Sequence, residues 1–159
     1  MKLGILGTGK IVQEFLPWLV EHTPFTVQAV CSTPRSAAKA AELCAQYQIP
    51  QHTTNYFELL QWVDAVYIAS PNSVHFDQAL AALRAGRHVL VEKPAVTRVA
   101  EWDALVALAH ERGLLLLEAM KVMCFPAMRA LLQRLPLLPA PRRLCAAFGS
   151  AQPPVGKLF

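Results

Sequence analysis

Residues 2–11 are the segment that most constrains how this chain can fold: a short apolar run, the turn Gly7-Thr8-Gly9, and the start of a helix. Leu3, Ile5 and Leu6 are typical of a buried parallel strand. The two glycines let the backbone turn tightly and approach a ligand with no Cβ in the way. The following helix offers free N–H groups and a positive dipole end, which favour a pyrophosphate. This order indicates the start of a dinucleotide-binding fold, although any strand–turn–helix unit shares it.

The rest of the chain alternates apolar strands with helices. Strands are predicted at 25–31, 64–69, 87–91 and 114–117 and, after a Pro-rich connection, at 143–148. Helices are predicted at 10–21, 36–47, 56–62, 73–85, 97–110 and 125–135. Thr97 is the expected N-cap of the fifth helix. Strict alternation at these intervals predicts right-handed parallel crossovers, and therefore a doubly wound α/β parallel sheet of the Rossmann type.

Composition narrows the class of protein further. At 159 residues and 54% hydrophobic content, the chain is long enough for one domain with a real core. Residues 1–118 hold nine Lys or Arg against eleven Asp or Glu, whereas residues 119–159 hold six bases and no acid. Those bases are dispersed among Leu, Ala and Pro without interleaved aromatics, so we expect no nucleic-acid partner. No apolar run reaches membrane-spanning length, and no signal-peptide pattern precedes the first strand, so we expect no membrane association.

The four cysteines are scattered, at Cys31, Cys44, Cys124 and Cys145. They have neither C-x-x-C spacing nor a histidine cluster nearby, so we expect no zinc or other metal site. Dispersed thiols of this kind are typical of a reducing compartment. The sequence therefore predicts a cytoplasmic protein with reduced cysteines.

Four predicted strand ends carry turn-forming or charged residues: Gly7-Thr8-Gly9, Ser70-Pro71-Asn72, Glu92-Lys93-Pro94 and Glu118-Ala119-Met120-Lys121. Ligands of doubly wound sheets bind at these ends. The Lys93 ammonium, beside a nicotinamide, could bond an oxygen at the reacting carbon and stabilise a developing alkoxide. Pro94 would fix this turn, with a cis bond as one option. The alternative for Lys93 is a surface ion pair with Glu92.

The end of the second strand bears on which cofactor is used. In dinucleotide folds this end faces the adenosine ribose, where an acid bonds the hydroxyls and an arginine accepts a 2′-phosphate. The turn has no acid and contains Ser32 and Arg35. This favours NADP over NAD, although Arg35 could also stack on an adenine or be a solvated helix residue.

Four segments together resemble a known family. They are KLGILGTGKI, VDAVYIASPNSVH, AGRHVLVEKP and LLLLEAM. In order and spacing they resemble the N-terminal domain of the glucose–fructose oxidoreductase, inositol dehydrogenase and rhizopine catabolism (Gfo/Idh/MocA) family. The resemblance runs from Met1 to about Pro126. Similar proteins transfer a hydride between NAD(P) and an alcohol or carbonyl carbon of a sugar, polyol or diol.

The resemblance implies a role for each matching position. The residues that would line the pyrophosphate are Gly7, Thr8, Gly9, Lys10 and Ile11. Those that would face the adenosine ribose or its phosphate are Ser32 and Arg35. Those that would line the cofactor cleft are Ala69, Ser70, Pro71, Asn72 and His75. Glu92 and Lys93 would stand by the nicotinamide, with Lys93 as the catalytic residue and Lys93-Pro94 as a cis bond.

The chain departs from the family pattern in three respects. Val12 replaces the usual small third residue of the glycine fingerprint, and Met123 stands where dihydrodiol dehydrogenases often carry an arginine. Family members are also longer, with a second domain that completes the substrate pocket and usually the oligomer interface. We therefore expect a dinucleotide-binding domain at 1–122, and at 123–159 a connecting helix and the start of a C-terminal domain.

Three functional hypotheses follow. The first is the cofactor-binding half of an NAD(P)-dependent oxidoreductase that turns over substrate poorly by itself, with a homo-oligomer as the full-length form. The second is a non-catalytic dinucleotide-binding sensor or scaffold. The third is a Rossmann-like domain that has lost its cofactor and serves as an interaction surface.

Overall fold

The computed structural model of the chain describes residues 1–120 and 125–134. Two compact units contain Met1–Met120 and Lys121–Phe159. The strands are β1 (Lys2–Leu6), β2 (Thr26–Cys31), β3 (Gln51–Thr53), β4 (Ala65–Ile68), β5 (His88–Val91) and β6 (Leu116–Glu118). The α-helices are α1 (Lys10–His22), α2 (Ala37–Tyr47), α3 (Tyr56–Trp62), α4 (His75–Arg84), α5 (Val99–Glu111) and, in the second unit, α6 (Pro126–Arg134). Two short 3-10 helices are also present: η1 (Pro34–Ser36) precedes α2, and η2 (Asn72–Val74) precedes α4.

The six strands form one sheet in the order β3-β2-β1-β4-β5-β6, and every neighbouring pair is parallel. The predicted doubly wound parallel sheet is confirmed. The strand order reverses between β1 and β4, because the chain first builds outward from β1 to β3 and then returns to build on the other side. At such a switch point the loops after the two central strands diverge and leave a crevice.

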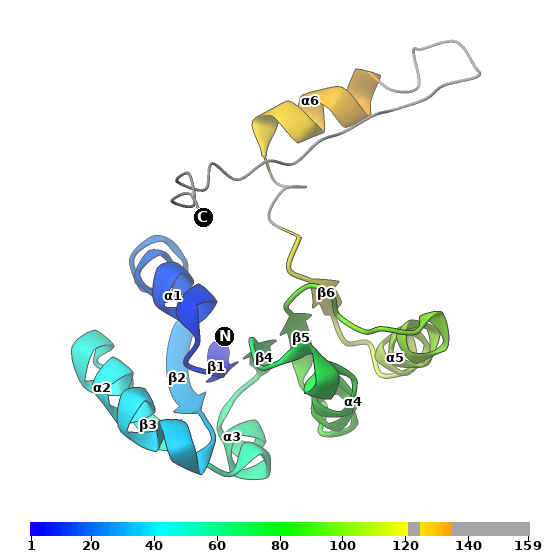
Figure 1. The fold of residues 1–159 in the computed structure, drawn as a ribbon. Helices are drawn as coiled ribbons and strands as arrows, with labels where there is room; N and C mark the ends of the chain where they lie inside the picture. Colours follow the sequence, from blue (N-terminus) through cyan, green and yellow to red (C-terminus); the bar gives the residue numbers. More distant parts are fainter. Residues whose placement is uncertain (121–124, 135–159) are drawn as a thin grey trace, which may run out of the picture. The chain divides into compact units, whose positions relative to one another are not determined.

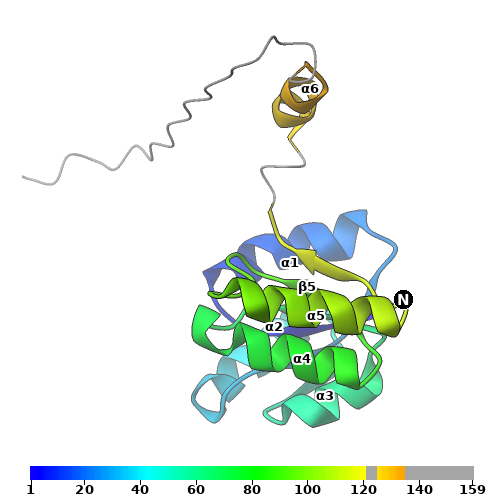
Figure 2. The same ribbon diagram turned by 90° about the vertical axis from the view of Figure 1, so that its right-hand side faces the viewer.

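Helices cover the sheet on both sides (Figure 1). On one side, α1 and α2 pack on β1 and β2 around a core that contains Ile5, Val12, Leu16 and Val30. On the other, α3, α4 and α5 lie side by side (Figure 2) over a core rich in buried Val, Leu and Ala. Val12, at the third position of the glycine fingerprint, is completely buried in this core, where its side chain takes the place of the usual small residue.

One strand was missed, and one local prediction is wrong. Strand β3 was not predicted, because three residues with exposed His52 at their centre carry no strand pattern by themselves; pairing with β2 defines it. The N-cap of α5 is Arg98 instead of Thr97, with no side-chain cap bond. The Arg98 guanidinium instead bonds the Glu101 carboxylate one turn later. The strand predicted at 143–148 lies outside the described residues.

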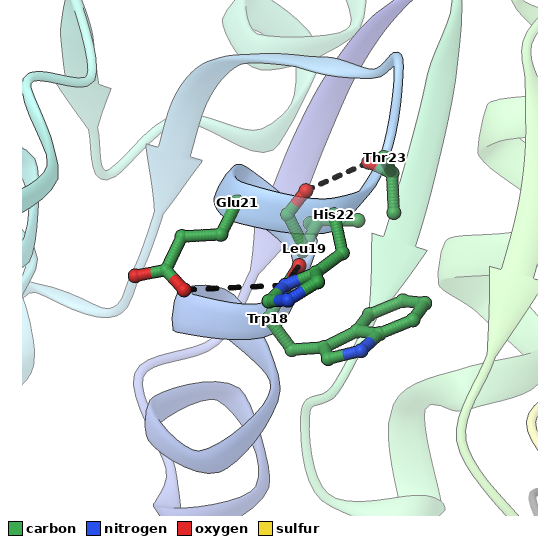
Figure 3. Close-up of polar contacts among 5 residues, drawn as sticks. All are labelled: Trp18, Leu19, Glu21, His22 and Thr23. Carbon is green, nitrogen blue, oxygen red and sulfur yellow. Dashed lines mark hydrogen bonds and ion pairs between the residues drawn. The ribbon is translucent and has the colours of Figure 1, made fainter.

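The last turn of α1 is closed by its own side chains (Figure 3). Thr23 Oγ1 donates to the Leu19 carbonyl at 2.7 Å, and the His22 ring stacks on Trp18 with centroids 5.8 Å apart. Because α1 runs antiparallel to the strands, this end lies at the amino edge of the sheet. His22 is thus remote from the strand carboxyl ends. None of the described helices is both long and apolar enough to cross a bilayer.

Candidate functional site

The turn after β1 lies directly against the loop after β4, at the switch point. Gly7 N donates to the Cys31 carbonyl at 2.8 Å and Ala69 N donates to the Leu6 carbonyl at 2.9 Å. Gly7 has φ +122°, and a Cβ built there would lie 2.6 Å from the Ala69 carbonyl oxygen. Only glycine fits this position, because an L side chain would be strained and would clash with backbone.

Open space lies on the other side of this turn, at Gly9, the N-cap of α1. A Cβ at Gly9 would meet nothing within 4 Å. The first turn of α1 contains no acid, and the amides of Lys10 and Ile11 precede the first amide bonded to Gly9 O, that of Val12. Unpaired amides at the positive end of a helix dipole suit an anion.

The end of β2 presents one cation and one buried hydroxyl. Ser32 is buried, and its Oγ donates to the Thr33 carbonyl at 3.2 Å while its amide bonds Thr53 O. Arg35 lies in the 3-10 turn η1 and is exposed. Arg35 is therefore better placed than Ser32 to meet a charged group from solvent.

The loop after β4 contains Ala69, Ser70, Pro71 and Asn72, and it ends at His75. Pro71 and Asn72 are exposed, and the Ser70 hydroxyl bonds Gln78. His75 is completely buried, with Nε2 at 2.9 Å from the Ser70 carbonyl and Nδ1 at 2.9 Å from the Pro94 carbonyl. Both nitrogens face backbone oxygens, so the ring braces two loops and does not present a polar atom to a cleft.

The loop after β5 holds Glu92 and Lys93, and the Lys93–Pro94 bond is cis. Tyr67 OH donates to Glu92 Oε1 at 2.6 Å. Burial and this hydrogen bond raise the pKa of Tyr67 well above its usual range, so the phenol keeps its proton and serves as the donor. Lys93 is exposed, and within the described part of the chain no ion pair joins it to Glu92. The surface pair considered as an alternative is absent there, because the carboxylate turns towards Tyr67.

The end of β6 completes the group. Glu118 Oε1 accepts a hydrogen bond from the Ala95 amide at 2.8 Å. A cavity of about 350 Å³ adjoins this contact and is lined in part by Val96, Val99 and Trp102. Sequence reasoning marked Glu118 as a strand end but assigned it no role, and it passed over Tyr67 altogether. A buried tyrosine hydroxyl needs a polar partner, and that requirement was the available signal.

The turn after β1 and the loops after β4 and β5 therefore meet at one edge of the sheet, with Arg35 beyond them at the end of β2. Within residues 1–120 and 125–134, no group of three His, Cys, Asp or Glu side chains could hold a metal ion. Glycines without Cβ atoms, free helix amides, an exposed arginine and an exposed lysine fit an elongated dianion with a polar head group.

Comparison with known proteins identifies the family. The model of an oxidoreductase family with an NAD-binding Rossmann fold, Gfo/Idh/MocA, matches residues 1–120. The chain belongs to the Gfo/Idh/MocA oxidoreductase family. Residues 1–120 accordingly match the NAD-binding Rossmann domain of that family.

Relatives within the Gfo/Idh/MocA family include the NADP(+)-dependent scyllo-inositol 2-dehydrogenase IolU of Bacillus subtilis, 33% identical over 93% of this chain and 45% of the relative. The mouse trans-1,2-dihydrobenzene-1,2-diol dehydrogenase is 34% identical over 82% of this chain and 40% of the relative. The chain thus spans less than half the length of these relatives.

A solved Gfo/Idh/MocA structure has a closely similar fold. KijD10, a 3-ketoreductase from Actinomadura kijaniata crystallised with NADP and TDP-benzene, is 33% identical. The superposition covers 86% of this chain and 42% of KijD10, with a TM-score of 0.78. A fold this similar holds NADP, which agrees with the fit of the site to a dinucleotide.

Proposed function

We propose that this chain binds a nicotinamide dinucleotide along the carboxyl edge of the sheet and supplies the cofactor-binding half of a hydride-transferring oxidoreductase. The observation that carries the proposal is that Gly7 and Gly9 have complementary roles in the turn after β1. One glycine lets two backbone segments meet, and the other keeps the space above the start of α1 open. The pyrophosphate would lie over Gly7, Thr8, Gly9, Lys10 and Ile11, where free amides stabilise its charge.

The nicotinamide end would lie between the loops after β4 and β5. Ala69, Ser70, Pro71 and Asn72 would line one side, and Glu92 and Lys93 the other. The bound cofactor supplies a hydride acceptor or donor at its nicotinamide ring. The Lys93 ammonium would bond the substrate oxygen and stabilise negative charge as the carbonyl is reduced or the alcohol oxidised. Glu92 would accept the hydrogen bond from the Tyr67 hydroxyl.

NADP is the cofactor that the adenosine side favours. Arg35 is exposed and follows β2 in a turn that contains no acid. A guanidinium binds a 2′-phosphate through charge-assisted hydrogen bonds, whereas NAD offers no charge at this point. The named cofactors of IolU and KijD10 agree with this preference.

The substrate class would be a sugar, polyol or related diol, by analogy with the inositol and diol dehydrogenases named above. We propose that 1–122 forms the cofactor domain and that 123–159 leads into a second domain that completes the substrate pocket. Leu115 and Leu117 are 58% and 54% exposed, which supports a homo-oligomer or domain contact on that side of β6. The free, buried thiols of Cys31 and Cys44 are compatible with a cytoplasmic location.

Titration of the chain with NADPH and NADH, followed by nicotinamide fluorescence, tests the proposal. Saturable binding with a preference for NADPH is expected. No change in nicotinamide fluorescence with either NADPH or NADH would overturn the proposal and leave an interaction domain that has lost its cofactor. In a longer protein that turns over substrate, Lys93→Ala should depress kcat more than cofactor affinity. Unchanged turnover would contradict the role of Lys93, and a longer protein that binds cofactor but turns over nothing would favour a sensor.

A further inference from the structure

The turn that carries Lys93 is held by side chains from three other elements. Tyr67 of β4 bonds the Glu92 carboxylate at 2.6 Å. His75, the first residue of α4, contacts the Pro94 carbonyl at 2.9 Å. Glu118 at the end of β6 accepts from the Ala95 amide at 2.8 Å. Lys93 is exposed, so its side chain is not fixed by packing, and its position depends on its backbone.

His75 is placed to couple two loops. Its ring is completely buried and lies between the Ser70 carbonyl, after β4, and the Pro94 carbonyl, after β5. A carbonyl oxygen only accepts, so each contact is a hydrogen bond only when the facing ring nitrogen carries a proton. A neutral imidazole carries one proton and holds one of the two carbonyls, through Nε2 to the Ser70 loop or through Nδ1 to the turn after Lys93, whereas the doubly protonated ring holds both.

Glu118 holds the same turn from its other side. Its partner, the Ala95 amide, is one residue beyond the carbonyl that His75 contacts. Ala95 is 2% exposed, so its amide has little access to water, and loss of the carboxylate would leave a donor without a replacement partner. The carbonyl and the N–H of the Pro94–Ala95 peptide group are thus anchored to α4 and β6, respectively.

We propose that His75 and Glu118 are positioning residues that fix the backbone of Lys93–Ala95, and that neither contacts the cofactor. His75 would act through Pro94 O, and Glu118 through Ala95 N. These contacts would also hold Lys93 beside the nicotinamide, and this consequence rests on the proposed function. This reassigns His75, which the sequence suggested as a lining residue of the cofactor cleft.

Amide hydrogen exchange of the cofactor-free chain tests the anchoring directly. Glu118→Ala should speed exchange at Ala95 roughly 10-fold, as expected for loss of one charge-assisted hydrogen bond. Glu118→Gln keeps an acceptor oxygen and should restore most of the protection. The matched control is Asp64→Ala, which removes a carboxylate–amide bond of 2.7 Å to Lys2 N at the opposite edge of the sheet. Unchanged exchange at Ala95 in Glu118→Ala would overturn the role of Glu118.

Two isosteric substitutions separate the tasks of His75. The amide nitrogen of Asn overlays Nδ1 of histidine, and that of Gln overlays Nε2. His75→Asn should therefore keep Lys93 and Ala95 protected and leave NADPH affinity within about 3-fold of wild type, whereas His75→Gln should lower that affinity roughly 10-fold. Equal effects of the two folded variants on the turn would refute the role of His75.

Urea unfolding of each variant shows whether it folds, and the Glu118 pair decides the anchoring claim should the His75 variants not fold. Wild-type chain that fails to bind NADPH would defeat the proposed function and not the anchoring, which exchange measures without cofactor. If the wild-type chain binds NADPH and both Glu118→Ala and His75→Gln bind it with unaltered affinity, the anchoring contacts do not hold Lys93 beside the nicotinamide. That result would leave the anchoring of the backbone itself intact.

Discussion

Replacing Gly7 by alanine should destabilise the fold through two separable effects. The φ of +122° is a conformation that an L residue adopts at a cost of about 1–3 kcal/mol. The new Cβ would also lie 2.6 Å from the Ala69 carbonyl oxygen, nearly an ångström inside ordinary contact. Ala69 cannot retreat freely, because its amide bonds the Leu6 carbonyl at 2.9 Å between the two central strands. Overpacking of this kind costs a further 1–3 kcal/mol or so.

Two other glycines supply the controls. Gly86 has φ +74° with nothing near a built Cβ, so Gly86→Ala should show the conformational effect alone, about 1–2 kcal/mol. At Gly9 the φ is −69° and the space is open, so Gly9→Ala should cost only about 0.5 kcal/mol of stability as a weaker N-cap. It should nevertheless weaken NADPH binding more than about 10-fold, because its methyl group occupies the space proposed for the pyrophosphate.

Urea unfolding followed by tryptophan fluorescence measures all three variants, with the slope against urea held to the wild-type value. The expected order of destabilisation is Gly7→Ala, then Gly86→Ala, then Gly9→Ala. The total for Gly7→Ala, roughly 2–6 kcal/mol, is a large part of the 5–15 kcal/mol that typically stabilises a domain. A loss at Gly7→Ala no greater than that at Gly86→Ala would refute the close approach of β1 and β4.

Three further measurements probe other parts of the domain. Arg35→Ala should weaken NADPH binding roughly 10-fold and leave NADH binding unchanged, and an equal loss for both cofactors would instead indicate stacking on adenine. Tyr67→Phe should lower the free energy of unfolding by about 1–2 kcal/mol, because Glu92 loses its donor; an unchanged urea midpoint would contradict this. Burial, with a smaller contribution from the Glu58 carboxylate, raises the pKa of Cys31 from 9.0 to about 11. The folded state therefore holds this proton more tightly, and its contribution to stability is full below pH 9 and lost as the pH rises towards about 11, by at most about 3 kcal/mol. Cys31→Ala should flatten that decline, and an equally steep decline in the variant would assign it to other groups.

Much of the fold could be predicted because its elements are defined locally. The apolar residues of β1, β2, β4 and β5 are bounded by turn-formers, and their spacing admits only parallel crossovers. The glycine turn, Arg35 and Lys93 were recognisable for the same reason, since each lies where a strand ends. β3 was missed because its strand character comes from pairing with β2, and Thr97 was misplaced because Arg98 and Glu101 set the start of α5.

The contacts around Lys93 could not be predicted, since each joins residues distant in the chain. Tyr67 meets Glu92, His75 meets Pro94, and Glu118 meets Ala95, and each pair is separated by 19 to 25 positions. Pattern and spacing act over a turn of helix or a few residues of strand, so they report which residues reach a sheet edge. They do not report which of those residues face one another across it.

Sequence alone thus determined the class of fold, the sheet edge at which we propose that the cofactor binds, and the residue types available there. The tertiary structure decided how each is used. It turned one oxygen of the Glu92 carboxylate to Tyr67 and the other to the Lys93 backbone amide, placed the buried His75 between two loops, and gave Gly7 and Gly9 opposite tasks. Local sequence sets backbone conformation, whereas the partner of a buried polar group is set by which strands the crossovers bring together.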